Sequence, residues 1–265
     1  MNFDYQVESI RTPALTLEYH LVPWDTEIIG KPVAQIRELR VQDPVAAARD
    51  YETFIGWRER HGVQLCSCRV PADRLVDSMF LEAQGFRFVE LNYLPRLTEL
   101  QSRQFAETNI VIAPAEQADR EQLADMAAQV LRIGRFHQDP RIDPALGDKR
   151  YRTWMTNAFS RPQQQTLKCL LDGAIVAFFV VEQPAADHCF WSLVGLAPGL
   201  QGQGLGKRVW NAMLQHHRNA GVQIVSTSIS SLNVVVLNLY VSLGFRFPAP
   251  SMTLQWLPPG GDVLR

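Results

Sequence analysis

An internal repeat restricts the folds that are open to this chain. Shifting the sequence by 159 residues places Gly85-Phe86-Arg87-Phe88 on Gly244-Phe245-Arg246-Phe247. The match runs without a gap over residues 42–88 against 201–247. A gapless register of this length indicates two copies of one supersecondary unit. We therefore predict that the first half is a partial second copy of the fold that the second half adopts.

Hydrophobic periodicity and turn residues predict the same arrangement in detail. Residues 1–100 are expected to form a partial domain, residues 108–265 a complete one, and Thr98–Glu107 a linker. In the first domain, Trp24-Asp25-Thr26-Glu27 is expected in a connection between strands at 15–22 and 32–39. In the second domain the predicted order is β-α-α-β-β-β-α-β-α-β-β. The expected fold class is α/β with mixed sheets, built from two tandem halves.

A glycine-rich loop stands in the second half, Gln201-Gly202-Gln203-Gly204-Leu205-Gly206-Lys207, between an apolar run and a helical pattern. Glycines let backbone N–H groups converge, and the unpaired amides of a first helical turn favour an anion. A cation such as Lys207 is unfavourable there unless an anion binds. We expect a phosphate site. The alternative is a glycine-rich turn beside two solvated cations, Lys207 and Arg208.

Spacing excludes two other phosphate loops. The glycines do not follow the GxGxxG pattern of a dinucleotide fingerprint, and Arg208 stands where a P-loop needs Ser or Thr. In the first copy, Asp43, Val45 and Ala47 stand opposite the three glycines. Their side chains would block the backbone amides, so the first copy is not expected to bind the same ligand.

Composition narrows the possible partners. The chain has 265 residues, a net charge of −1 and a pI near 6.6, which argues against nucleic-acid or polybasic membrane-surface binding. It has no 18-residue apolar run, and residues 1–10 lack the apolar segment of a secretion signal. We expect a cytoplasmic protein with no nucleic-acid or membrane partner. A homodimer is left open.

Cysteines and histidines do not predict a metal site. Cys66 and Cys68 lie on one face of a predicted strand without a second ligand pair, so packing thiols are expected. His216 and His217 are expected on a helix surface. His188, at the start of a strand, could act as a base or lie in a turn. No metal cofactor is expected.

Two motifs resemble the GNAT acetyltransferase family, which binds acetyl coenzyme A. They are Gln201-x-x-Gly204-x-Gly206 and Asn233-x6-Tyr240-x3-Gly244-Phe245. The resemblance implies that the pyrophosphate lies on the loop amides, the pantetheine along the preceding strand, and that Tyr240 protonates the leaving thiolate. A phenol with a pKa near 10 suits that role. The cofactor-binding residues implied are Val194, Leu196, Gln201, Gly202, Gln203, Gly204, Leu205, Gly206, Lys207 and Asn233.

A looser similarity spans nearly the whole chain. Trp24-Asp25-x4-Gly30, Gly85-Phe86-x2-Val89-Glu90 and Arg135-Phe136 resemble the dTDP-fucosamine acetyltransferase family, which acetylates an amine on a nucleotide-linked deoxysugar. The resemblance implies that Glu90 is the base; the alternative is an exposed residue of an alternating strand. Arg135, His137 and Arg141 are the expected acceptor contacts, the two arginines for its diphosphate; otherwise they are solvated loop residues.

Other functions stay open at this point. The chain could acetylate another small amine or a protein N-terminus, or transfer a slightly larger acyl group. It could also be a scaffold that binds coenzyme A without transferring anything.

Overall fold

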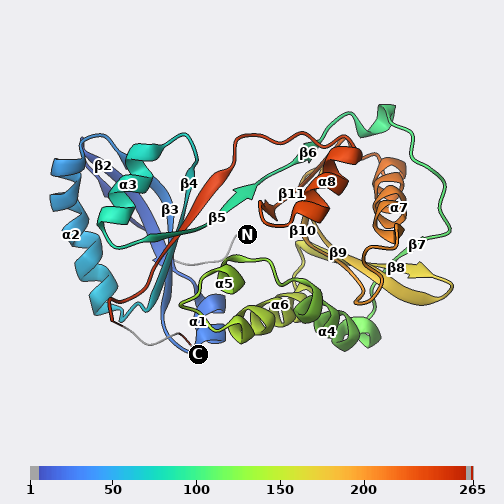
Figure 1. Ribbon diagram of the computed structural model, residues 1–265, viewed down its shortest axis with the longest axis horizontal. Helices are drawn as coiled ribbons and strands as arrows, with labels where there is room; N and C mark the ends of the chain where they lie inside the picture. Colours follow the sequence, from blue (N-terminus) through green and yellow to red (C-terminus); the bar gives the residue numbers. More distant parts are fainter. Residues whose placement is uncertain (1–5, 261–263, 265) are drawn as a thin grey trace. The chain divides into compact units, whose positions relative to one another are not determined.

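The computed structural model describes residues 6–260 and 264, so five residues of the segment considered as a secretion signal lie outside the described part. The chain divides into two compact units (Figure 1). Unit 1 comprises Met1–Asn92, Arg135–Leu146 and Ala249–Arg265, and unit 2 comprises Tyr93–Gly134 and Gly147–Pro248. The expected boundaries at residues 100 and 108 do not describe this division, because two later segments pack into unit 1.

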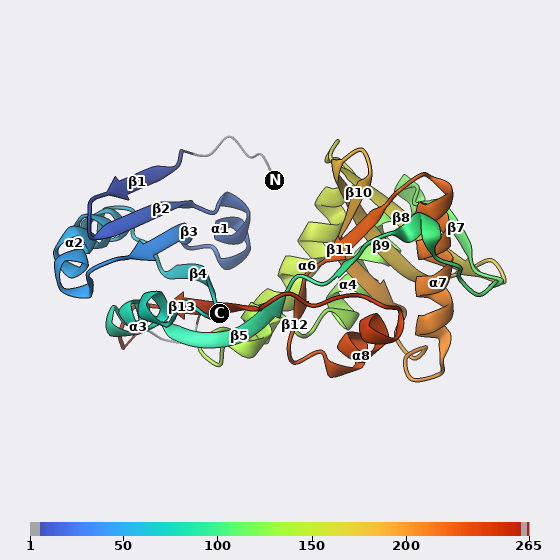
Figure 2. The ribbon, with the colours of Figure 1, turned by 90° about the horizontal axis from the view of Figure 1, so that it is seen from above.

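Strands of unit 1 lie side by side in the order β1-β2-β3-β4-β13-β5. The first three run antiparallel and appear one beside the next in Figure 2, whereas β3 and β4 are parallel. The parallel pair is joined by a helix, as a crossover requires. The strand bounds are β1 Glu8–Arg11, β2 Leu15–Leu21, β3 Val33–Val41, β4 Leu65–Pro71, β5 Arg87–Tyr93 and β13 Ser251–Trp256.

Helices α2 (Pro44–Arg60) and α3 (Leu75–Ala83) cover one face of this sheet. Their buried side chains, such as Phe54 and Leu81, form one apolar cluster with strand residues that include Leu254 of β13. A short helix, α1 (Pro23–Ile29), occupies the connection that was expected between β2 and β3. Proline in the first helical turn favours this start because its fixed φ already suits a helix.

Strand β13 explains why the sequence boundaries do not match the units. It pairs antiparallel with both β4 and β5, so it fills a central place in the sheet of unit 1 (Figure 1, red strand). Without it, β4 and β5 would each present an unpaired edge. The second half therefore supplies a strand to the first.

The sheet of unit 2 has the strand order β6-β11-β10-β9-β8-β7. Helices α7 and α8 pack on one side of it, and α4 and α6 pack against Phe178, Val180 and Leu193. The strands are β6 Arg96–Leu97, β7 Val111–Pro114, β8 Gln164–Leu171, β9 Ala174–Ala185, β10 His188–Leu196 and β11 Ile224–Thr227, and the helices are α4 Arg120–Val130, α6 Pro144–Ala158, α7 Leu205–Asn219 and α8 Val234–Ser242.

The element boundaries follow the 159-residue shift. Helix α3 and helix α8 begin and end at corresponding positions, as do the first residues of β4 and β11. After each helix a glycine takes the same left-handed conformation, with φ of 86° at Gly85 and 84° at Gly244. Both units thus contain a strand, a helix, a parallel strand and a second helix.

Candidate active site

The glycine-rich loop ends at the N-terminus of α7. Gly202 and Gly204 have φ values of 77° and 75°, which side chains disfavour, and Gly204 is the N-cap residue. No side chain of the described residues caps the helix at this position. The loop residues Gln201–Gly204 are exposed. The first amides of α7 are therefore accessible to an anion from solution.

The first copy fills the corresponding position with its own carboxylate. Asp43 is the N-cap of α2, and its Oδ1 accepts hydrogen bonds from the amides of Val45 and Ala46 at 3.0 and 3.3 Å. An aspartate at this position satisfies the helix amides and opposes any second anion. Only α7, of the two related helices, presents uncapped amides.

Strands β10 and β11 separate next to the loop. They are paired from His188 and Ile224 as far as Trp191 and Thr227, where β11 ends. Strand β10 continues to Leu196, paired on its other side with β9. The hydroxyl of Thr227 donates to the carbonyl of Trp191 at 2.9 Å. We call this point the fork; beyond it, one edge of β10 has no strand partner among the described residues.

Tyr240 lies on α8 beside the fork and is 2 % exposed. Its ring is 4.8 Å from that of Phe245 and 6.5 Å from that of Trp191. Burial raises the pKa of Tyr240 to about 12, while the adjacent side chains of Trp210 and Thr227 act in the opposite direction. The phenol therefore carries its proton throughout the neutral range and can donate it.

Asn233 has a local structural role. It is the N-cap of α8, where its side-chain oxygen accepts from the amide of Val236 at 3.4 Å. Helix α8 also approaches α7 closely, since a side chain added at Gly206 would lie 3.6 Å from Leu239. The first turn of α7 thus lies against α8, the helix that Asn233 begins and that carries Tyr240.

Glu90 belongs to unit 1 and is not an exposed residue of an alternating strand. It is 3 % exposed and sits opposite Thr253 of β13. Its Oε1 lies 3.9 Å from Nη2 of Arg69, and its Oε2 has no hydrogen-bond partner among the described residues. A buried carboxylate oxygen without a partner is costly, which is typical of a functional group.

Neither Arg135 nor Arg141 is a solvated loop cation. Arg135 donates to the fully buried Asp25 at 2.7 Å. Arg141 makes two bonds to Asp139, at 2.9 and 2.7 Å, and a third to the carbonyl of Gln255 at 3.1 Å. These contacts lie within unit 1. The alternative of solvated loop residues is wrong, because each guanidinium group is held by a buried carboxylate, whereas a contact with the acceptor stays a prediction.

The segment that carries these arginines is anchored by apolar side chains as well. Phe136, Ile142 and Leu146 pack in one cluster with Val22, Ile29, Val33, Leu65 and Leu264. Residues Arg135–Gln138 form a short helix, α5, which places His137 at a partly buried position. The sequence did not indicate that this segment belongs to unit 1, since its partners are more than 70 residues away.

Comparison with known proteins found a family match in the second half of the chain. Residues 131–245 match the acetyltransferase (GNAT) family. We call this part of the chain, which is similar to that family, the GNAT domain. The chain therefore carries an acyltransferase, and the GNAT domain includes the loop, the fork and Tyr240.

The first half shares the fold. A tandem GNAT protein from the clavulanic acid biosynthesis pathway is 13 % identical, with a TM-score of 0.64 over 97 % of this chain and 85 % of its own. A GCN5-related N-acetyltransferase from Kribbella flavida is 16 % identical, with a TM-score of 0.62 over 97 % and 91 %. The chain therefore has the tandem GNAT fold.

One curated relative comes from a polysaccharide pathway. The spore coat polysaccharide biosynthesis protein SpsD of Bacillus subtilis (strain 168) is 18 % identical over 222 residues, covering 84 % of this chain and 76 % of SpsD.

His216 and His217 of α7 were both expected on the surface of a helix. His216 is partly buried, but His217 is 5 % exposed and accepts a hydrogen bond from Nε1 of Trp191 at 3.0 Å. Burial lowers the pKa of His217 to about 4. The prediction of a surface position is wrong for His217, because α7 turns this residue toward the sheet.

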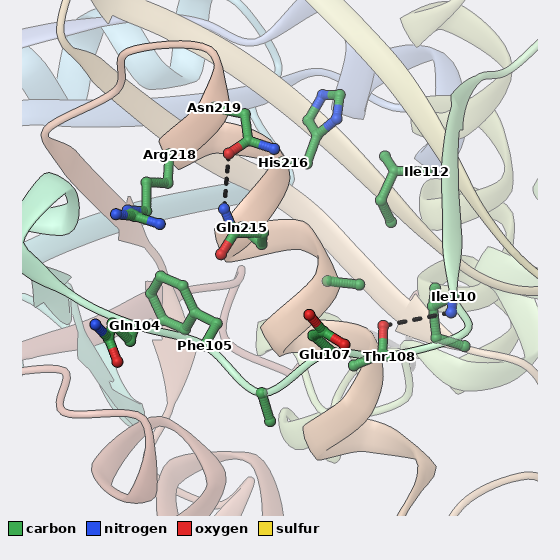
Figure 3. A pocket seen from close by; sticks show the side chains of 12 residues that line it. Gln104, Phe105, Glu107, Thr108, Ile110, Ile112, Gln215, His216, Arg218 and Asn219 are labelled. Carbon is green, nitrogen blue, oxygen red and sulfur yellow. Dashed lines mark hydrogen bonds between the residues drawn. The ribbon is translucent and has the colours of Figure 1, made fainter.

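A cavity of about 740 Å³ lies at the other end of α7 (Figure 3). Residues 104–108, Ile110 and Ile112 line one side, and Ala212, Gln215, His216, Arg218 and Asn219 line the other. Gln215 is about 15 Å along the helix axis from the first turn of α7. The cavity is therefore separate from the glycine loop of the GNAT domain.

The described residues contain no candidate metal site and no candidate membrane span. Over the described residues there is no group of three or more His, Cys, Asp or Glu side chains that could hold a metal ion. In the same part of the chain, no helix is long and apolar enough to cross a membrane. All four cysteines are buried free thiols, and burial raises the pKa of Cys66 to about 12.

Proposed function

We propose that this GNAT protein transfers an acetyl group from acetyl coenzyme A to a primary amine on a nucleotide-linked amino sugar. The observation that carries the proposal is the uncapped N-terminus of α7, with its left-handed glycines, directly after the fork. A pyrophosphate on the amides of Gln201–Lys207 would place the pantetheine along the open edge of β10, at Val194–Leu196. Asn233, the N-cap of α8, completes the proposed cofactor site.

The transfer needs four groups. The neutral amine attacks the thioester carbonyl carbon, and backbone amides near Leu196 stabilise the oxyanion. When the intermediate collapses, the carbon–sulfur bond breaks and Tyr240 gives its proton to the thiolate. Glu90 is the proposed base for the amine proton, directly or through water, which is supported by the unpartnered oxygen of its buried carboxylate.

The sugar class rests on a separate argument. The relative SpsD is named for spore coat polysaccharide biosynthesis, which supports a sugar acceptor. Acetyltransfer to another small amine or a protein N-terminus, transfer of a larger acyl group, and binding of coenzyme A without transfer are the competing functions.

Release of free thiol from acetyl coenzyme A separates these functions. The panel contains nucleotide-linked amino sugars, the matching free amino sugars, polyamines and a peptide with a free N-terminus. We expect acceptor-dependent thiol release with the nucleotide-linked sugars alone. Release with polyamines or peptide only would overturn the substrate class, and binding of coenzyme A without release on any amine would indicate a scaffold.

A further inference from the structure

Two arginines of unit 2 face each other without a counter-charge. Arg96 of β6 and Arg246 exchange both backbone hydrogen bonds, at 2.9 and 2.8 Å, in an antiparallel bridge. Residues paired in this way project their side chains on the same side of the sheet, where like charges are destabilising. Both are exposed, and neither forms an ion pair with a carboxylate among the described residues. An anion bound between them would remove the repulsion.

Two further polar groups lie beside the arginine pair. Arg96 is also directly opposite Ser226 of β11, which is 6 % exposed, so the three side chains share one face. Nε2 of His188 lies 2.6 Å from the hydroxyl of Ser226. We call Arg96, Ser226, His188 and Arg246 the arginine cluster.

The charges around His188 favour its neutral form. Burial lowers the pKa of His188, the charge of Arg96 lowers it further, and Asp187 at the preceding turn raises it. Arg246 adds a second positive charge on the same face. The cluster thus presents two permanent cations and two hydrogen-bonding groups, which suits an anion better than a cation.

The cluster lies at the level of the fork but on the other face of the sheet. Ser226 immediately precedes Thr227, the last residue of β11 that pairs with β10. Successive strand residues point to opposite faces, and Tyr240 lies on the Thr227 side. An acceptor that approaches from the Ser226 side would therefore reach a thioester held in the fork without crossing the tyrosine.

We propose that the arginine cluster is the subsite for the diphosphate of the nucleotide-linked acceptor. This inference rests on the proposed function and replaces Arg135 and Arg141 in that role, since both are held by buried carboxylates. Guanidinium groups bind phosphate oxygens bidentately, so two of them on one face match a diphosphate.

Binding of thymidine diphosphate and uridine diphosphate to the full chain tests the subsite. The protein is first saturated with coenzyme A, so that the glycine loop is occupied, and calorimetry then measures the nucleotide. Arg96→Gln and Arg246→Gln should each weaken binding roughly 10- to 150-fold, the effect of one lost hydrogen bond to a charged group. The control is Arg152→Gln, at a partly exposed arginine of α6 that pairs with Glu121 and Asp125, and it should not change nucleotide binding.

Thermal unfolding of the same variants gives a second readout. Because removal of one arginine relieves repulsion in the unliganded protein, both variants should melt at or above the wild-type temperature. The nucleotide should raise the melting temperature of the wild type more than that of either variant. If one variant fails to fold, the other carries the test.

The outcomes separate this inference from the proposed function. No nucleotide binding to the wild type, or equal binding by the wild type and both arginine variants, would overturn the subsite. Nucleotide binding that depends on both arginines, together with no acetylation of any amino sugar, would retain the subsite and overturn the proposed function alone.

Discussion

Replacing Gly204 with valine tests the cofactor site without removing a single side chain. Gly204 has a φ of 75°, and a Cβ added there meets no atom within 4 Å. The substitution therefore strains the backbone at residue 204, but the new side chain does not clash with a neighbouring atom at its Cβ. Holding a branched residue in the left-handed region costs about 1–3 kcal/mol. Either the loop keeps its shape with a side chain beside the helix amides, or it relaxes and turns them away.

The effect on affinity follows from the contact that is lost. A hydrogen bond from a backbone amide to a charged phosphate contributes about 1.5–3 kcal/mol. Loss of one such bond weakens coenzyme A binding roughly 10- to 150-fold, and loss of several abolishes it in practice. Calorimetric titration with coenzyme A measures this change directly, and the melting temperature reports the strain separately.

Gly221→Val is the matched control. Gly221 follows the other end of α7, has a φ of 83°, and also has no atom within 4 Å of an added Cβ. The two variants should lose similar stability, each melting roughly 2–4 °C lower for every kcal/mol of strain. Only Gly204→Val should lose affinity. Wild-type affinity in Gly204→Val, or an equal loss in both variants, would refute the assignment of the loop.

Three further predictions concern the chemistry and the core. Tyr240→Phe should lower kcat roughly 10²- to 10⁴-fold with coenzyme A affinity unchanged. Because burial raises the pKa of Tyr240 to about 12, only about 1 % of the phenol is ionised at pH 10, so ionisation of Tyr240 should cause no loss of rate below pH 10. An unchanged kcat in Tyr240→Phe would contradict the acid role. Glu90→Gln should lower kcat with coenzyme A affinity unchanged, and an unchanged kcat would exclude Glu90 as the base. The folded-state pKa of His217, about 4, lies below its unfolded value near 6.5, so stability is full above pH 6.5 and falls by about 3 kcal/mol as the pH drops to 4. Urea titrations measure the free energy of unfolding at each pH. In His217→Gln, whose amide oxygen can still accept from Trp191, this free energy should no longer fall between pH 6.5 and 4. The same fall in the variant as in the wild type would show that His217 is not its cause.

The sequence predicted features that depend on local chemistry. The helical periodicity and the glycines that follow it predict α3 and α8 at corresponding positions. A helix often ends at a residue in the left-handed conformation, and glycine is the residue that favours this conformation. The glycine loop and its apolar strand were found by the same local signals. Proline at residue 23 could have indicated α1, since it is favoured in a first helical turn.

Features that depend on distant partners were missed. Asp25 and Arg135 are 110 residues apart, so no spacing rule links them, and Arg135 was expected to contact the acceptor or to be a solvated loop residue. The burial of Glu90 depends on β13, which joins its sheet from far along the chain. The facing of Arg96 and Arg246 likewise follows from strand pairing alone.

Because β13 lies between β4 and β5, the sheet of unit 1 cannot be completed on the ribosome until β13 has been synthesised. Roughly 160 residues separate β5 from β13, which at 5–20 residues per second means a delay of about 8–30 s. During this interval the nascent first unit exposes two strand edges and lacks Leu254 in its apolar cluster. Unit 1 therefore cannot complete its sheet until β13 has been translated, and a chain stopped before Ser251 would leave the ribosome with an open sheet. We expect such truncated chains to be substrates for chaperones and proteases rather than shorter active enzymes.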